Sequence, residues 1–93
     1  MKLPTDYTRL NWEERKQSRE QYIKEQNHLC MYCNSYIFKD PPSDILDKKI
    51  NWKLFPKNFL KYSVHLQHNH KTGMTEGAVH NYCNAVMWQY EGK

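Results

Sequence analysis

Two pairs of metal-ligand residues, set far apart in the chain, constrain its fold more than any other feature. Cys30-Met-Tyr-Cys33 is one pair, and His80-Asn-Tyr-Cys83 repeats its spacing with histidine in the first place. Both members of such a pair reach one ion because a tight turn wraps the chain around it, and two pairs complete a tetrahedral zinc site. The sequence therefore predicts a structural zinc that ties an N-terminal helix to the C-terminal part of the chain.

Composition favours a metal staple of this kind. The 93 residues allow one domain, and a hydrophobic fraction of 39% describes a thin core. Three cysteines cannot all be paired as disulfides, whereas zinc thiolates suit a reducing cytosol. Two other interpretations stay open: His28 or His65 is the fourth ligand, or the cysteines are ordinary buried thiols. We favour His80 because it alone lies three residues from Cys83.

Membrane and secretory segments are not expected. Met1–Leu10 lacks the apolar core of a signal peptide, and no apolar run approaches the length of a transmembrane helix.

The first half of the chain predicts helices joined by a less regular connector. After an irregular arm, Asn11 and Glu14 have capping-box spacing, so we expect a helix from about residue 12 to 26. A thin stripe of Trp12, Tyr22 and Ile23 would dock it. The connector is predicted to contain, in order, a strand-like Tyr36–Phe38, a short helix from Ser43 or Asp44, and a helical turn at Pro56–Leu60.

The C-terminal part predicts a hairpin followed by a helix. Ser63–His68 alternates apolar and polar residues as a strand does, Lys71-Thr-Gly73 carries turn chemistry, and Gly77–Val79 is the return strand. Asn81–Tyr90 is expected to be helical, with Val86, Met87 and Tyr90 inward and Gly92 just past its end. The fold class is thus a small zinc-stabilised α+β domain over residues 1–93. It divides into arm and helix (1–29), knuckle and basic connector (30–62), and hairpin-helix unit (63–93).

A lysine-rich run marks the connector. The net charge is only +4, yet no acidic residue follows Asp47 until after residue 62, and four aromatic residues are interleaved with the lysines. The run is either a solvated face or a surface that binds a polyanion backbone. The lysines predicted to bind nucleic acid are Lys49, Lys53, Lys57, Lys61 and Lys71.

A second polar cluster is a candidate catalytic site. His65-Leu-Gln-His-Asn-His70 ends the first strand of the hairpin, and Asn84 follows Cys83 directly, which fixes it against that hairpin. Phosphodiester hydrolysis needs a base that activates water and a cation that neutralises developing charge. A histidine at a strand end and an amide oxygen on the facing helix are suited to these two roles.

These motifs together resemble the HNH endonucleases of ββα-metal fold, especially small phage proteins related to recombination endonuclease VII. The resemblance covers Cys30–Asn84 and is close at the two ends of that span. It implies a structural zinc, DNA as the substrate, and a catalytic divalent cation, Mg²⁺, Mn²⁺ or another. It also implies the cytoplasm of a bacterial host, and it allows a phage or host protein as partner.

The resemblance also assigns residue roles. His68 would be the general base, Asn84 a ligand of the catalytic cation, and His70 a residue that organises the loop or contacts the scissile phosphate. His80 departs from the family's usual four-cysteine zinc site, which zinc chemistry accommodates.

Gln67 is the serious departure from the family. The family usually has Asp or His there as the other ligand of the catalytic ion, and glutamine offers only a neutral oxygen. Met87 also stands where the family has an acidic residue. Either Gln67 disables the enzyme, or a weak metal site is completed by DNA phosphate. Since neighbours on a regular strand face opposite sides, Gln67 and His68 can share one site only if the strand bends.

Two alternatives to a nuclease remain at this stage. One is a zinc-stapled DNA-binding module without catalysis, and the other is a protein-interaction adaptor. The sequence leaves the oligomeric state, monomer or dimer, open.

Overall fold

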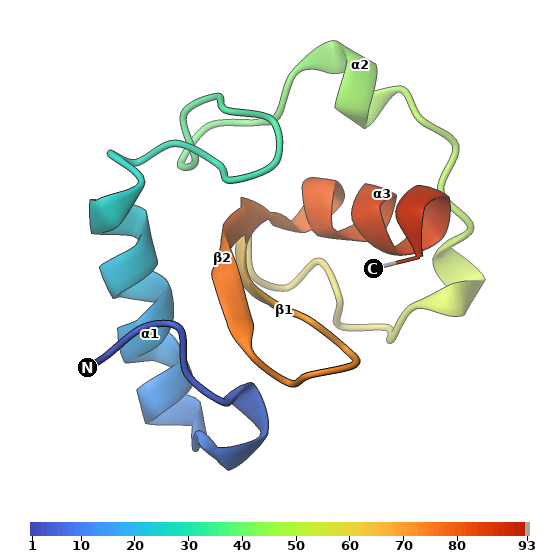
Figure 1. Cartoon of the computed structure of the whole chain (residues 1–93). Helices are drawn as coiled ribbons and strands as arrows, with labels where there is room; N and C mark the ends of the chain where they lie inside the picture. The colour runs from blue at the N-terminus through green and yellow to red at the C-terminus, as the bar shows by residue number, and fades with distance from the viewer. Residues whose placement is uncertain (93) are drawn as a thin grey trace.

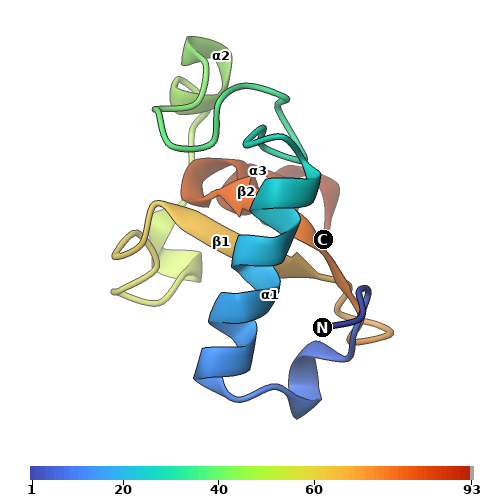
Figure 2. The ribbon, with the colours of Figure 1, turned by 90° about the vertical axis from the view of Figure 1, so that its left-hand side faces the viewer.

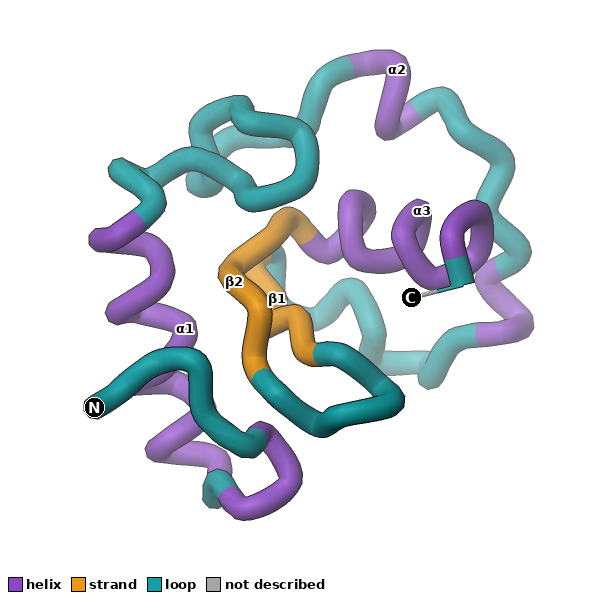
Figure 3. The backbone as a smooth tube through the Cα atoms, viewed as in Figure 1, coloured by secondary structure: helices purple, strands orange, loops and turns teal. Residues whose placement is uncertain are grey.

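A two-stranded antiparallel sheet lies between two helices in the computed structural model, which describes residues 1–92 (Figure 1). The helices are α1 (Trp12–Glu25) and α3 (Asn81–Glu91), and the strands are β1 (Val64–His68) and β2 (Thr75–His80). The chain between α1 and β1 is mostly loop (Figure 3). It contains the short helix α2 (Ser43–Leu46) and the 3-10 turn η2 (Trp52–Leu54); a further 3-10 turn, η1 (Tyr7–Arg9), lies in the N-terminal arm. None of the helices in this described part is long and apolar enough to cross a membrane.

Helix α1 begins and ends as its sequence predicts, but it docks differently. The side chain of Asn11 accepts from the backbone N–H of Glu14, and Glu14 returns the bond to Asn11, so the capping box is present. Ser18 and Ile23 are buried. Trp12, predicted to dock the helix, is instead 72% exposed. That prediction was wrong because only one end of this helix face is buried: Trp12 and Ile23 lie about three turns apart on the same side of α1, and the side chain is buried at Ile23 but not at Trp12.

The β hairpin is irregular at the position that matters for the site. Leu66 pairs with Ala78 and Gln67 with Gly77, but His68 pairs with Thr75, so the register shifts between Gln67 and His68. Glu76 is the extra residue on the opposite strand, which makes this a β-bulge. Regular pairing is therefore interrupted at the two residues, Gln67 and His68, that would have to share a site.

The edge of β2 that does not pair with β1 is covered by segments from the first third of the chain (Figure 2). Met31 N–H donates to the Ala78 carbonyl at 3.0 Å, and the side chain of Gln26 bonds both the N–H and the C=O of Ala78. A Cβ on Gly77 would lie 2.6 Å from the sulfur of Met31 and 2.8 Å from Oε1 of Gln26, so a larger residue would have to displace these two side chains. These contacts hold the Cys30–Cys33 turn against the hairpin.

The C-terminal helix supplies much of the core. Its buried residues include Cys83, Val86 and Met87, and Gly92 ends it with a left-handed φ of 70°. Tyr90 was predicted to point inward and does not: it is exposed, and its hydroxyl donates to the Lys49 carbonyl.

The connector forms fewer helical turns than predicted. Helix α2 starts at Ser43 as expected, but Pro56–Leu60 is a set of turns and the helical segment is η2, just before it. Packing of aromatic rings explains the difference, since Phe55 and Phe59 have centroids 4.7 Å apart and Trp52 contacts both. Among the strand-like Tyr36–Phe38 segment, only Ile37 is buried. Tyr36 forms an isolated bridge with Leu29.

Candidate functional site

The four predicted zinc ligands meet in one place. The ligand atoms of Cys30, Cys33, His80 and Cys83 all lie within 4.8 Å of one another. Zinc–ligand bonds of about 2.0 to 2.3 Å imply tetrahedral edges of about 3.5 to 3.8 Å. The Nδ1 atom of His80 lies 3.4 Å from the sulfur of Cys33 and 3.6 Å from that of Cys83. The donor set and its spacing therefore fit zinc, and the group could hold this ion.

The surrounding structure orients these ligands. His80 Nε2 lies 3.1 Å from the Tyr36 carbonyl, so a proton on Nε2 donates there and leaves Nδ1 free to face the sulfurs. Such outer bonds typically fix the tautomer of a metal-binding histidine. Asn34 adopts a left-handed φ of 63° and donates its N–H to the Cys30 carbonyl, which closes the turn.

The three thiols also influence one another. A hydrogen bond from Cys83 lowers the pKa of Cys30 to about 4, and the same contact together with burial raises the pKa of Cys83. One negative charge is thus favoured and further ionisation is opposed. A bound cation would relieve that opposition and let every sulfur act as a thiolate ligand.

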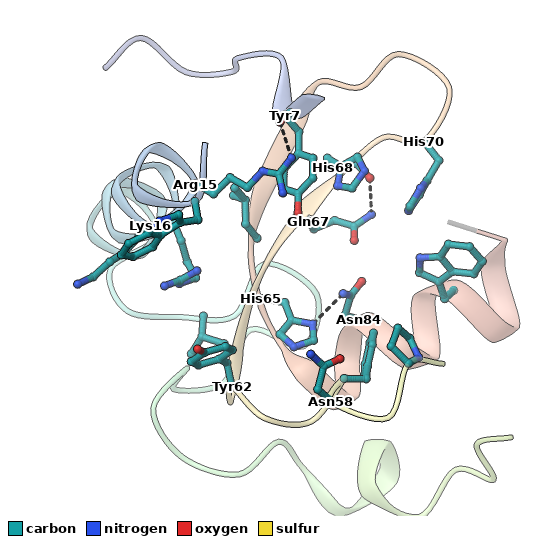
Figure 4. A pocket seen from close by; sticks show the side chains of 17 residues that line it. Tyr7, Arg15, Lys16, Asn58, Tyr62, His65, Gln67, His68, His70 and Asn84 are labelled. Carbon is teal, nitrogen blue, oxygen red and sulfur yellow. Dashed lines mark hydrogen bonds between the residues drawn. The ribbon is translucent and has the colours of Figure 1, made fainter. Parts of the chain in front are cut away.

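A second site is a cleft of about 630 Å³ along β1, bounded by α1, by α3 and by the loop before β1 (Figure 4). It brings together the residues predicted to be catalytic, which come from β1, the loop after it and α3. The members of this group are Gln67, His68, His70 and Asn84.

Two amide side chains face each other in the cleft. Asn84 Nδ2 donates to Nδ1 of His65 at 3.0 Å, while Asn84 Oδ1 is buried and has no hydrogen-bond partner within residues 1–92. Gln67 is 2% exposed; its Nε2 donates to the His68 carbonyl at 3.0 Å and lies 3.4 Å from a carboxylate oxygen of Glu76. These bonds leave the side-chain oxygens of Gln67 and Asn84 directed toward one another (Figure 4).

His68 is held in a row of rings beside these oxygens. It stacks on Tyr7 with centroids 3.9 Å apart and planes 6° apart, and the Arg15 guanidinium carbon lies 3.9 Å from the Tyr7 centroid. His70 lies 4.5 Å from His68 and contacts Trp88. Burial, then the positive charges of His70 and Arg15, lower the pKa of His68. Its imidazole is therefore neutral near pH 7 and able to accept a proton.

Sequence reasoning missed several members of this site. His65 was named in the polar cluster and as an alternative zinc ligand but was given no role beside Asn84; it lies outside the cysteine group and bonds Asn84. Its position two residues before Gln67, on the same face of a strand, was the available signal. Nothing in the sequence indicated that Tyr7 belongs to the site. The N-terminal arm reaches the hairpin only in the folded structure, where the Tyr7 N–H donates to the Gly73 carbonyl.

The predicted lysines do not form the wall of this cleft. Lys49, Lys53, Lys57 and Lys61 are exposed and do not line it, and Lys71 borders a smaller hollow beside Gln67. The cationic side chains that line the cleft come from α1: Arg15, Lys16 and Arg19. A nucleic-acid role for the five lysines stays a prediction.

Comparison of the chain with protein-family models, with curated proteins and with solved structures gives no match.

Proposed function

We propose that this protein is a metal-dependent DNA endonuclease of the HNH type, held together by a structural zinc. One observation carries the proposal: the buried oxygen of Asn84, without a hydrogen-bond partner, faces the oxygen of Gln67 beside a neutral histidine. A buried polar atom without a partner costs about 1 to 3 kcal/mol, so its retention calls for a ligand. Two neutral oxygens suit a hard divalent cation.

The chain's own residues supply the rest of the chemistry. A divalent cation at these oxygens would neutralise charge on the scissile phosphate and stabilise the leaving oxygen. His68 accepts a proton from water, whose oxygen forms a bond to phosphorus while the bond from phosphorus to the leaving oxygen breaks. Tyr7 fixes the plane of the His68 ring by stacking on it. His70, which is exposed and lines the cleft, would contact the phosphate.

The neutral ligand pair agrees with a weak cation site that is completed by substrate. Asp or His at position 67 would bind the cation without help, whereas two amide oxygens need additional ligands such as phosphate oxygens. Gln67 nevertheless has a defined orientation, because its Nε2 is bonded and its oxygen is left toward Asn84. This orientation favours a working, substrate-assisted site over a disabled one.

The strand–turn–strand–helix order, with the cysteine group at its base, agrees with the ββα-metal unit that the sequence resembles. A non-catalytic DNA-binding module is the second candidate, and the basic side of α1 in the cleft favours it.

Loss of the His68 side chain separates the two candidates. We expect His68→Ala to reduce DNA cleavage by about 100-fold or more, because a positioned general base contributes about that much. DNA affinity, measured without added divalent cation, should stay within about twofold of the parent protein's. His28→Ala is the matched control, since His28 is exposed and outside the cleft. Undiminished cleavage by His68→Ala contradicts the assigned base, and absence of cleavage by the parent protein with every cation favours the binding module.

A further inference from the structure

One face of α1 has a composition that core packing does not explain. Trp12, Arg15, Lys16 and Arg19 recur at the spacing of a single helical face, and all four line the cleft. Trp12 is 72% exposed even though it is the largest residue of the helix. This face therefore lines the cleft with aromatic and cationic groups over its first turns, and it reaches the core only at Ile23, one turn after Arg19.

The loop before β1 lines the same cleft with further aromatic residues. Tyr62 and Phe59 line it, and Tyr62 is 64% exposed. Figure 4 shows Tyr62 and Lys16 on the α1 side of β1, with His65 and Asn84 on the α3 side. Among the described residues, the side chains lining the cleft include three permanent cations and no carboxylate. Its charge is therefore complementary to that of a polyanion.

We propose that this cleft binds a single unpaired DNA strand, with bases stacked on Trp12 and Tyr62 and phosphates at Lys16 and Arg19. Grooves that bind single strands combine cationic side chains along the backbone with aromatic side chains on which bases stack. Bases in a duplex are already stacked on one another, so exposed aromatic faces inside a cleft gain nothing from a paired substrate. A cavity of about 630 Å³ within a molecule measuring 35 × 27 × 22 Å also favours one strand over two.

This inference rests on the proposed function, because the strand would be held beside His68 and Asn84. It adds the substrate class: single-stranded DNA, or the unpaired part of a flap or branch. A duplex would be cleaved only where it opens.

The test is fluorescence anisotropy, without added divalent cation, using a labelled oligothymidine of about 15 nucleotides and a blunt duplex of equal length. We expect the single strand to bind about tenfold or more tightly than the duplex. Trp12→Ala and Tyr62→Ala should each weaken strand binding by about 5- to 100-fold, as loss of one stacked base does. Trp12→Phe should retain most of the affinity because it keeps a ring.

Matched controls lie elsewhere on the surface. Tyr36→Ala removes an exposed tyrosine outside the cleft, and Lys24→Gln with Lys39→Gln matches the charge lost in Lys16→Gln with Arg19→Gln. These controls should change strand affinity by about twofold or less, whereas the cleft pair should lower it about tenfold and reduce its salt dependence.

Two results would overturn the inference: equal or tighter binding of duplex, or loss of affinity in Trp12→Ala and Tyr62→Ala no greater than in Tyr36→Ala. Neither result bears on the proposed nuclease activity, which is tested separately by cation-dependent cleavage. Tight strand binding that needs Trp12 and Tyr62, with no cleavage under any cation, would uphold the inference and refute the proposed function.

Discussion

The cysteine group and the cleft are both built where α3 meets the hairpin, but their ligands differ in kind. The first has three sulfurs and an imidazole nitrogen, within 4.8 Å of one another and almost entirely buried. The second has two neutral oxygens in an open cleft, with Asn84 Oδ1 unpartnered. A complete, closed donor set is typical of a structural metal, and an incomplete, open set is typical of a catalytic one. Cys83 and Asn84 are adjacent, so one helix positions both sites.

The largest expected effect is the loss of stability when a ligand of the cysteine group is replaced. Cys83→Ser should lose zinc and cooperative unfolding together, because a structural zinc contributes about 10 to 16 kcal/mol, as much as a small domain's whole stability. Zinc content by mass spectrometry and melting by circular dichroism measure this. His80→Cys is the matched variant and should keep the metal, since zinc accepts four thiolates. A Cys83→Ser protein that melts like the parent would show that the group is not a structural zinc site.

A smaller and different effect is expected in the cleft. Asn84→Ala should reduce cleavage by about 100-fold, as loss of a transition-state contact does, while zinc content and melting temperature change little. Asn84→Asp keeps an oxygen at the site and adds charge, so it should retain activity. Plasmid nicking measured beside zinc content separates the two sites. Parent-level cleavage by Asn84→Ala would remove this residue from the catalytic site.

Removal of the Tyr7 ring, which stacks on His68, should have only a modest effect on the cleavage rate. Tyr7→Ala removes a stacked pair worth about 0.5 to 1.5 kcal/mol, so kcat should fall by about 2- to 12-fold with KM unchanged. Tyr7→Phe keeps the ring, so its kcat should equal that of the parent protein. If the hydroxyl mattered instead, Tyr7→Phe would lose as much kcat as Tyr7→Ala. Equal kcat for parent and Tyr7→Ala would exclude positioning by this ring.

The two sites also differ in how far the sequence predicts them. The cysteine group could be predicted because CxxC and HxxC spacing is itself the geometry of the site. The hairpin and α3 were also predictable, from alternation at Val64–His68 and from Gly92 as the helix end. The histidine cluster and Asn84 were singled out from the sequence, but the separate roles of His68 and Asn84 came from the resemblance.

What the sequence did not predict depends on contacts distant in the chain. Tyr7 reaches His68 because the arm bonds to the turn of the hairpin at Gly73. Trp12 has the spacing of a docking stripe with Ile23, but the core covers only the Ile23 end of that face, which the sequence does not show. Which face of α1 turns to the cleft is decided by the packing of Ser18 and Ile23 and by the bonds of Gln26 to Ala78.

Cation-dependent nicking of supercoiled plasmid by the parent protein and by Gln67→Asp tests the central claim most directly. Mg²⁺, Mn²⁺, Co²⁺ and Ni²⁺ would each be titrated against zinc-loaded protein. We predict that the parent nicks DNA at high cation concentration, and that Gln67→Asp needs about tenfold less cation, because a carboxylate replaces a neutral ligand. If neither protein nicks DNA with any of these cations while both stay folded and zinc-loaded, this protein is not a nuclease.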